Sequence, residues 1–177
     1  MIGTPRRPTR RQTDNEGSVR VGVLMPLADL LLGMRVDVAE LLADVGLDPT
    51  VFDDADNRIA ITVEHRLLAL AARRSGCDHI GLLVGQRGGL QIFGLAGLLV
   101  RYSPDVQTGR THFRALSANS RTGSKSRAGA VRNVATLSWQ TFQPGVETAG
   151  QVGDAALAVM FNTMRELCGP DYVSGAN

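Results

Sequence analysis

The spacing of apolar residues is most regular in the segment 151–172, where it predicts a long helix. Apolar side chains recur every three or four residues, and polar ones share the remaining side. Gly169 and Pro170 end the helix, because glycine accepts a left-handed conformation and proline cannot continue the hydrogen-bond ladder. We expect this helix to be buried over most of its circumference, as a core element covered by the rest of the chain or by a second copy.

The same periodicity predicts more helices before it. The predicted segments are 26–45, 63–75, 78–87, 93–101 and 105–116. Gly33 is a point where the first can divide, and Thr62 is the expected N-cap of the second. Gly46, Gly76 and the pair Gly88-Gly89 are expected to end the first three of these helices.

One strand is predicted, at 134–142, where VATLSWQTF is rich in β-branched and aromatic residues. Val131 and Arg132 are candidates for its hairpin partner, whereas most of 107–132 is rich in Ser, Arg and Gly and is expected to be loop. The fold class predicted is therefore α+β, a mainly helical single domain with a small antiparallel sheet or hairpin packed on the C-terminal helix.

Length and composition together indicate a single domain with a tail at each end. With 177 residues, 44% of them hydrophobic, the chain can form one domain with a core. Residues 1–20 are predicted to be a disordered basic tail, 21–172 the domain and 173–177 a second tail. No apolar run is long enough for export or a membrane span, so a cytoplasmic location is expected.

Charge says little about nucleic acid, since the formal net charge is +2 and all basic residues but Lys125 are arginine. Seven carboxylates fall between 36 and 57, and seven basic residues with one carboxylate between 101 and 132. The basic stretch is either a solvated loop or a polyanion contact. A helix-turn-helix at 38–54 is disfavoured because its second half is acidic.

No constellation for catalysis, metal binding or cofactor binding is found in the sequence. The three histidines lack metal-ligand spacing, and no phosphate-binding motif occurs. Cys77 and His79 are close in sequence, yet two such neighbours at the start of a helix point in different directions. Cys77 and Cys168 are expected to be reduced core thiols. We therefore expect a protein that is not an enzyme.

Several segments resemble a known family in order and spacing. They are LLADVGLDPTVFDDADNRIAI, HRLLALAARRSGCDHIGLLVGQR, FGLAGLLVRYSPDV and VATLSWQTFQPGVETAGQVGDAALAVMFNTMRELCGPDY. Together they resemble the N-terminal arabinose-binding regulatory domain of AraC/XylS-type transcriptional regulators, over roughly 26–172. The resemblance implies a sensor and dimerisation module for an unknown small-molecule effector, with a sugar as one possibility. It further implies self-association or pairing with a related regulator, and action on DNA only through a helix-turn-helix domain.

Two departures from the family pattern shape the hypothesis. The sequence ends five residues after Tyr172 without a DNA-reading domain, and 111–132 does not follow the family pattern of a leucine-bearing helix and a hairpin strand. We therefore expect a truncated or split regulator. The alternatives are a standalone interaction protein that forms mixed dimers with a full-length regulator, or a non-functional gene remnant.

Four residues are the candidates for ligand binding. A site of this kind needs a concave apolar surface with a few polar groups, and the predicted strand should face the last helix. The candidates are Trp139, Phe142, Phe161 and Arg165. The plainer interpretation of each residue is an ordinary core or surface position.

Overall fold

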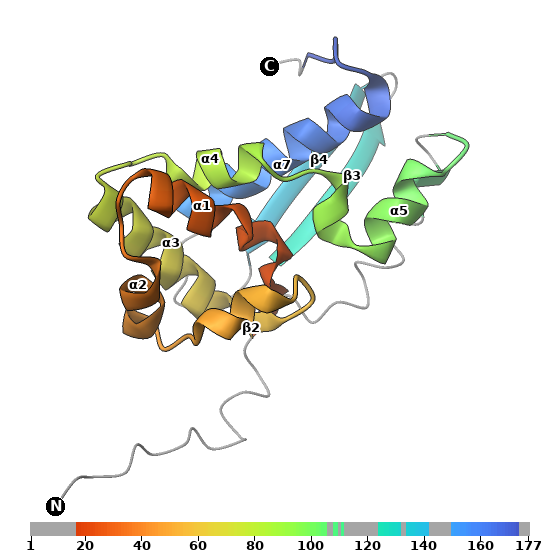
Figure 1. Cartoon of the computed structure of the whole chain (residues 1–177). Coiled ribbons are helices and arrows are strands. Elements are labelled where there is room, and N and C mark those ends of the chain that lie inside the picture. The colour runs from red at the N-terminus through yellow and green to blue at the C-terminus, as the bar shows by residue number, and fades with distance from the viewer. Residues whose placement is uncertain are drawn as a thin grey trace, which may run out of the picture.

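The computed structural model describes residues 17–105, 108–109, 111, 124–131, 134–141 and 150–173, and in the hairpin the side chains of Trp139 and Gln140 only. Helices dominate, and one antiparallel hairpin packs beside the last helix (Figure 1). The predicted α+β class, mainly helical with a small sheet, is confirmed.

A short two-stranded sheet fastens the start of the described chain. Strand β1 (Ser18–Arg20) pairs antiparallel with β2 (Arg58–Ala60), placing Val19 opposite Ile59. Both of these side chains are buried. The predicted tail 1–20 is therefore corrected at its end, because burial of Val19 and the ladder hydrogen bonds hold its last three residues in a strand.

The helix predicted for 26–45 is two helices, α1 (Pro26–Gly33) and α2 (Val38–Asp44), preceded by the 3-10 turn η1 (Val21–Leu24). The chain turns at Arg35, which has a φ of 60° in the left-handed region. The Asp37 side chain then caps α2 by accepting the Glu40 N–H at 3.0 Å. Gly33 thus marks the division that the sequence indicated.

Further helices follow the turn η2 (Pro49–Asp53): α3 (Ile61–Ser75), α4 (Ile80–Gln86), η3 (Leu90–Phe93) and α5 (Leu95–Arg101). The prediction that Thr62 caps α3 is wrong, because the helix begins earlier, at Ile61, whose N–H donates to the Gly17 carbonyl at 2.9 Å. The predicted helix 93–101 is interrupted by Gly94, with a φ of 57°.

The hairpin consists of β3 (Ser124–Val131) and β4 (Val134–Thr141), with Ser126 opposite Trp139. The predicted strand 134–142 is confirmed over the described residues. The loop predicted for 124–130 is wrong, because cross-strand backbone hydrogen bonds hold small and polar residues of low strand propensity in a ladder. Val131, a candidate for the hairpin partner, does pair with β4, opposite Val134. Most of the predicted helix 105–116 lies outside the described residues.

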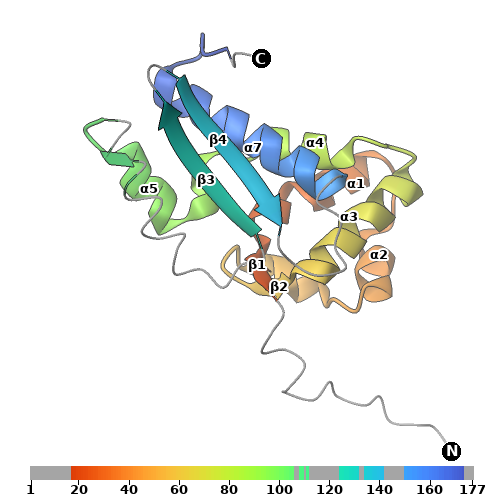
Figure 2. The same ribbon diagram turned by 180° about the vertical axis from the view of Figure 1, so that it is seen from behind.

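Helix α7 (Gln151–Cys168) ends at Gly169 as predicted. Its burial is narrower than predicted, since only Val152, Ala155, Ala158 and Val159 are buried. Leu157 is 61% exposed and Phe161 38% exposed. The reason is that α4 and the hairpin flank α7 on two sides and leave part of its apolar surface uncovered (Figure 2).

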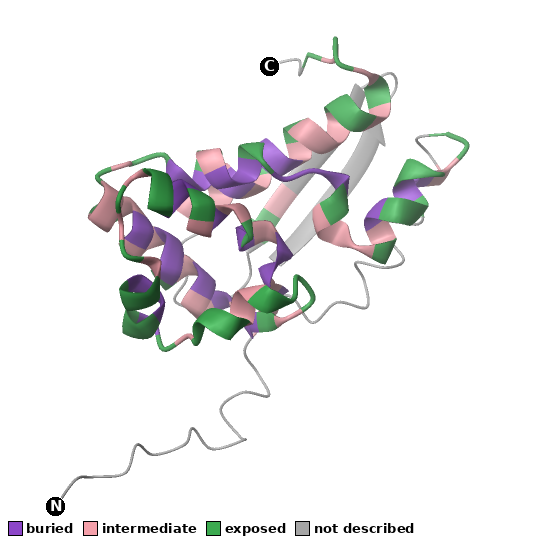
Figure 3. Ribbon diagram, viewed as in Figure 1, coloured by how far each residue is buried: buried purple, intermediate pink, exposed green. Residues whose placement is uncertain are grey.

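The hydrophobic core lies in the helical half that ends with α4 (Figure 3). The largest fully buried side chains are Val21, Leu24, Leu27, Leu31, Leu41, Leu42, Ile61, Leu67, Leu68, Ile80 and Val84. Burying one such side chain contributes about 1.5–3 kcal/mol to folding. This core supports the surface on which α7 packs.

Helices α4 and α7 lie side by side and run in the same direction along a glycine seam (Figures 1 and 2). A Cβ at Gly81 would overlap the backbone of Gln151, and one at Gly85 the backbone of Ala155. The Gln151 side chain also fixes the start of α4: it accepts the Gly81 N–H at 2.7 Å and donates to the Asp78 carbonyl at 2.6 Å. The seam sets the position of α7 on the core.

Candidate functional site

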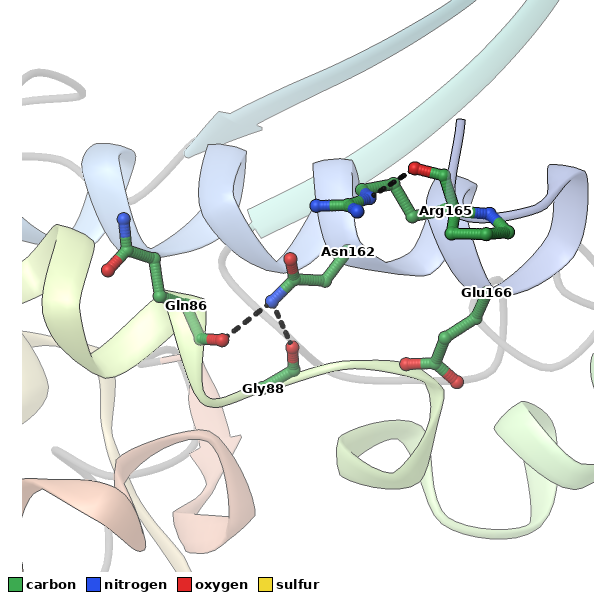
Figure 4. Close-up of a pocket in the computed structure, with 6 residues that line it drawn as sticks. Gln86, Gly88, Asn162, Arg165 and Glu166 are labelled. Atoms are coloured by element: carbon green, nitrogen blue, oxygen red, sulfur yellow. Dashed lines mark hydrogen bonds between the residues drawn. The ribbon is translucent and has the colours of Figure 1, made fainter. Parts of the chain in front are cut away.

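A shallow groove of about 440 Å³ lies where α4 ends beside the second half of α7. Its lining consists of Gln86, Gly88, Asn162, Arg165, Glu166 and Pro170 (Figure 4). Three of these residues lie on α7 within five positions of each other. We call this surface the α4–α7 groove.

Asn162 joins the two walls of the groove. Its side-chain nitrogen donates to the carbonyls of Gln86 and Gly88, both at 2.8 Å (Figure 4). The last carbonyls of a helix lack partners within the helix, so Asn162 supplies the missing donor for α4. Its orientation is therefore fixed by the fold.

Glu166 closes the groove toward η3. Its Oε1 accepts the Leu90 N–H at 3.2 Å. A Cβ at Gly89 would overlap this carboxylate, so the close approach requires glycine there. In Figure 4 the Glu166 side chain points to the segment that follows Gly88. The groove thus has an anionic end.

Arg165 supplies the cationic part of the groove. Its Nε donates to the Pro170 carbonyl at 3.1 Å, and its guanidinium carbon lies 5.9 Å from the centre of the Phe161 ring. Phe161 also contacts the Tyr172 ring at 6.2 Å between centres. Among the described residues, the two terminal nitrogens of Arg165 have no hydrogen-bond partner. They are free to bind an anion.

The four sequence candidates separate in the structure. Arg165 lines the groove, and the Phe161 ring lies beside the Arg165 guanidinium on the exposed side of α7. Trp139 is half-buried and packs on the hydrophobic core, away from the residues that line the groove. Phe142 lies outside the described residues. The structure therefore brings two candidates together.

Sequence reasoning missed Asn162 and Glu166 as groove residues. Both lie on the polar side of the predicted helix beside Arg165, and this cluster of polar residues near a helix end was the available signal. Gln86 and Gly88 could not be found this way, because their relation to Asn162 spans 76 and 74 residues of chain.

Cysteine chemistry finds little support in the geometry. Cys77 is half-buried against the core, whereas Cys168 is exposed, which corrects the expectation that both are core thiols. Cys168 is the last residue of α7, and the core extends along that helix only near its start. Within the described residues, no three His, Cys, Asp or Glu side chains form a potential metal cluster, and no helix is long and apolar enough to cross a membrane.

A buried carboxyl lies away from the groove, on the core face of α3. Glu64 is 5% exposed, and burial raises the pKa of its carboxyl to about 7. The neighbouring His65 has its pKa lowered by burial, and its Nε2 has no hydrogen-bond partner within the part of the chain that the structure describes. Both belong to the core region rather than to the groove.

Comparison with protein families gives a match over residues 36–175, to the arabinose-binding domain of AraC transcription regulators, N-terminal. A search of curated proteins found no match. Strand β1 and helix α1 precede the matched range, yet β1 pairs with β2 inside it, so the folded unit begins earlier than the match. Because the match covers most of the chain, the chain belongs to the family of N-terminal arabinose-binding domains of AraC transcription regulators.

Proposed function

We propose that this domain senses a small-molecule effector in the α4–α7 groove and passes the signal on through contacts with another protein chain. The observation that carries the proposal is the guanidinium of Arg165, held at its Nε by the Pro170 carbonyl and placed beside the Phe161 ring. A fixed cation beside an aromatic face binds ligands that combine a carboxylate with an apolar or ring surface. A regulator of transcription acts in the compartment that holds the DNA, so the proposed location is cytoplasmic.

The groove favours a small, polar effector. Arg165 offers two terminal nitrogens to a carboxylate, and Glu166 offers an acceptor to a hydroxyl or ammonium group. The groove is shallow, so a large apolar ligand would gain little burial there. A sugar acid or another hydroxy acid fits this chemistry better than a neutral sugar.

The proposal is tested by calorimetric titration with arabinonate and arabinose. We expect arabinonate to bind more tightly than arabinose, and Arg165→Gln to weaken arabinonate binding about 10-fold, because a charge-assisted hydrogen bond is lost. Arg66→Gln, an exposed arginine on α3, is the matched control and should bind as the wild type does. Equal affinities of the Arg165→Gln and Arg66→Gln variants would contradict the groove as the effector site.

The output of the domain is proposed to be self-association or pairing with a related regulator. Helix α5 exposes one apolar face formed by Leu95, Leu98, Leu99 and Tyr102, which are 69%, 52%, 42% and 81% exposed. Their spacing over three, four and seven residues places them on one side of the helix. Exposed apolar helix faces of this kind serve as protein contacts. In this proposal the domain acts on DNA only through the protein chain that it contacts.

Sedimentation over a range of concentrations tests this output. Wild-type protein should associate as its concentration rises, and Leu98→Asp should shift the mass toward the monomer because a charge is placed in the contact. Leu32→Asp, at a position 63% exposed on α1, is the control and should leave association unchanged. A wild type that stays monomeric throughout, or equal behaviour of both variants, would argue against α5 as the contact.

A further inference from the structure

A second cavity, of about 220 Å³, lies where three segments meet on the helical half. We call it the Arg20–Arg87 cavity. Its lining comes from β1 through the start of α1, from the turn after η2, and from the segment that runs from the end of α4 into η3. The lining residues are Arg20, Gly22, Met25, Pro26, Ala55, Arg87, Gln91 and Ile92.

Arg20 is a positioned cation in this cavity. One terminal nitrogen donates to the Ile92 carbonyl at 3.1 Å, and the other pairs with Asp56. A Cβ at Gly94 would lie 2.7 Å from the same guanidinium, so glycine there allows the close approach. The side chain is only 28% exposed. Arg20 thus ties all three segments together and keeps its orientation.

Arg87 adds a second positive charge without a matching carboxylate. It contacts the Leu83 carbonyl at 3.3 Å through one nitrogen and forms no ion pair among the described residues. Within the part of the chain that the structure describes, no carboxylate lines the cavity, and Asp56 pairs with Arg20. The excess charge at the cavity is therefore positive, which favours an anion.

The remaining walls are mostly apolar, formed by Met25, Pro26, Ala55 and Ile92. A cavity of this volume is below the size of about 300 Å³ at which drug-sized ligands begin to fit. From the charge, the walls and the size together, we propose that the Arg20–Arg87 cavity binds a small monocarboxylate with a short apolar chain. The carboxylate lies on Arg87 and the chain contacts Met25 and Ile92.

The position of Arg87 connects this site to the α4–α7 groove. Gln86 and Gly88 line the groove, and Arg87 between them lines the cavity, so one three-residue segment forms part of both walls. A ligand bound in the cavity limits the motion of this segment. It thereby changes the free energy of binding a second ligand in the groove. This coupling rests on the proposed function of the groove; binding in the cavity does not.

Binding is tested with butyrate, 1-butanol and inorganic phosphate, followed by amide chemical shifts of the isotope-labelled full chain. Butyrate should give saturable shifts at Gly22, Arg87 and Ile92, whereas butanol lacks the charge, phosphate lacks the chain, and both should bind at least several-fold more weakly. Arg87→Gln should weaken butyrate binding about 10-fold, and Arg87→Lys should retain most of it.

Arg165→Gln separates this proposal from the groove proposal, because it changes the groove alone. Butyrate affinity should be unaffected by it. Equal shifts with butanol, an Arg87→Gln variant that binds as tightly as wild type, or butyrate shifts confined to the residues around Arg165 would each overturn the cavity site. Thermal melting checks that the variants remain folded; Arg87 is exposed, so its replacement should leave the melting temperature near that of wild type.

Discussion

The helical half from η1 to α4 buries its large apolar residues. The surface formed by α5 with the second half of α7 exposes several of them. Every large side chain that is fully buried among the described residues belongs to the first region. In the second, Leu95, Leu98 and Phe161 are exposed, and Figure 3 shows exposed residues along α5 and the later turns of α7. The contrast indicates that the first region supplies most of the buried core, whereas the second leaves apolar side chains in contact with solvent.

Helix α7 connects the two regions. Its first turns pack on α4 through Ala155 and Val159, and its later turns carry Asn162, Arg165 and Glu166 into the groove. The side chains proposed to bind the effector are thus placed on a rigid element whose other end is anchored in the core. The following substitutions test whether stability and binding are divided in this way.

Truncation of the core should have the largest effect. Leu67 is fully buried on α3, so Leu67→Ala should lower the free energy of unfolding by about 2–5 kcal/mol through lost burial and a cavity. Leu98→Ala on α5 should change it by about 0.5 kcal/mol or less, because the side chain is exposed. Urea denaturation measures both. Similar losses in the free energy of unfolding from the two substitutions would contradict the difference between the two regions.

The buried carboxyl of Glu64 should make stability depend on pH. Burial raises its pKa from 4.5 to about 7 in the folded state. Between these values the unfolded chain loses a proton that the folded chain retains, so the free energy of unfolding falls as pH rises and levels off above 7. The total decrease is about 3 kcal/mol, by the free energy of a pKa shift of this size.

Glu64→Gln isolates this effect. The variant should match wild type near pH 5 and exceed its stability near pH 8 by roughly 1–3 kcal/mol, since glutamine carries no charge to bury. His65 acts in the opposite direction, because a lowered histidine pKa reduces stability as pH falls. The His65 contribution is the same in wild type and in Glu64→Gln. It therefore cancels when the free energies of unfolding of these two proteins are compared by denaturation at each pH. A difference independent of pH would exclude a titrating Glu64.

An effect comparable to that of Glu64→Gln is expected at the seam that joins the regions. Gly85→Ala should cost about 1–3 kcal/mol, because its Cβ would overlap the Ala155 backbone. Gly33→Ala is the control: nothing lies within 4 Å of that Cβ, and alanine favours helix by about 0.4–1 kcal/mol. Thermal melting of both variants measures the difference. Equal stability would mean that the seam is not closely packed in solution.

Much of the fold could be predicted from the sequence because helical periodicity is a local property. The segments 63–75 and 151–168 have apolar residues on one side, and the end of the last helix at Gly169 follows from residue type alone. Strand β3 was missed apart from Val131, because its small and polar residues gain their extended form from pairing with β4. The exposure of Leu157 was also missed, because periodicity does not say which elements cover a face.

The candidate site was predictable only in part, for a similar reason. Phe161 and Arg165 are four residues apart on one helix, so their contact follows from helix geometry. Trp139 packs on the core, because an aromatic side chain at a strand can face either the core or a ligand and the sequence does not decide between them. The Asn162 contact with Gln86 depends on how two distant helices pack.

The contacts at the two ends of α4 have a consequence for biosynthesis. This seven-residue helix contains two glycines, and the side chain that binds its first turn comes 70 residues later, at Gln151. A helix so short and glycine-bearing is unstable by itself. On the ribosome, the nascent chain therefore cannot complete its helical half until α7 has emerged, and during that interval it presents unfinished apolar surface to chaperones and proteases.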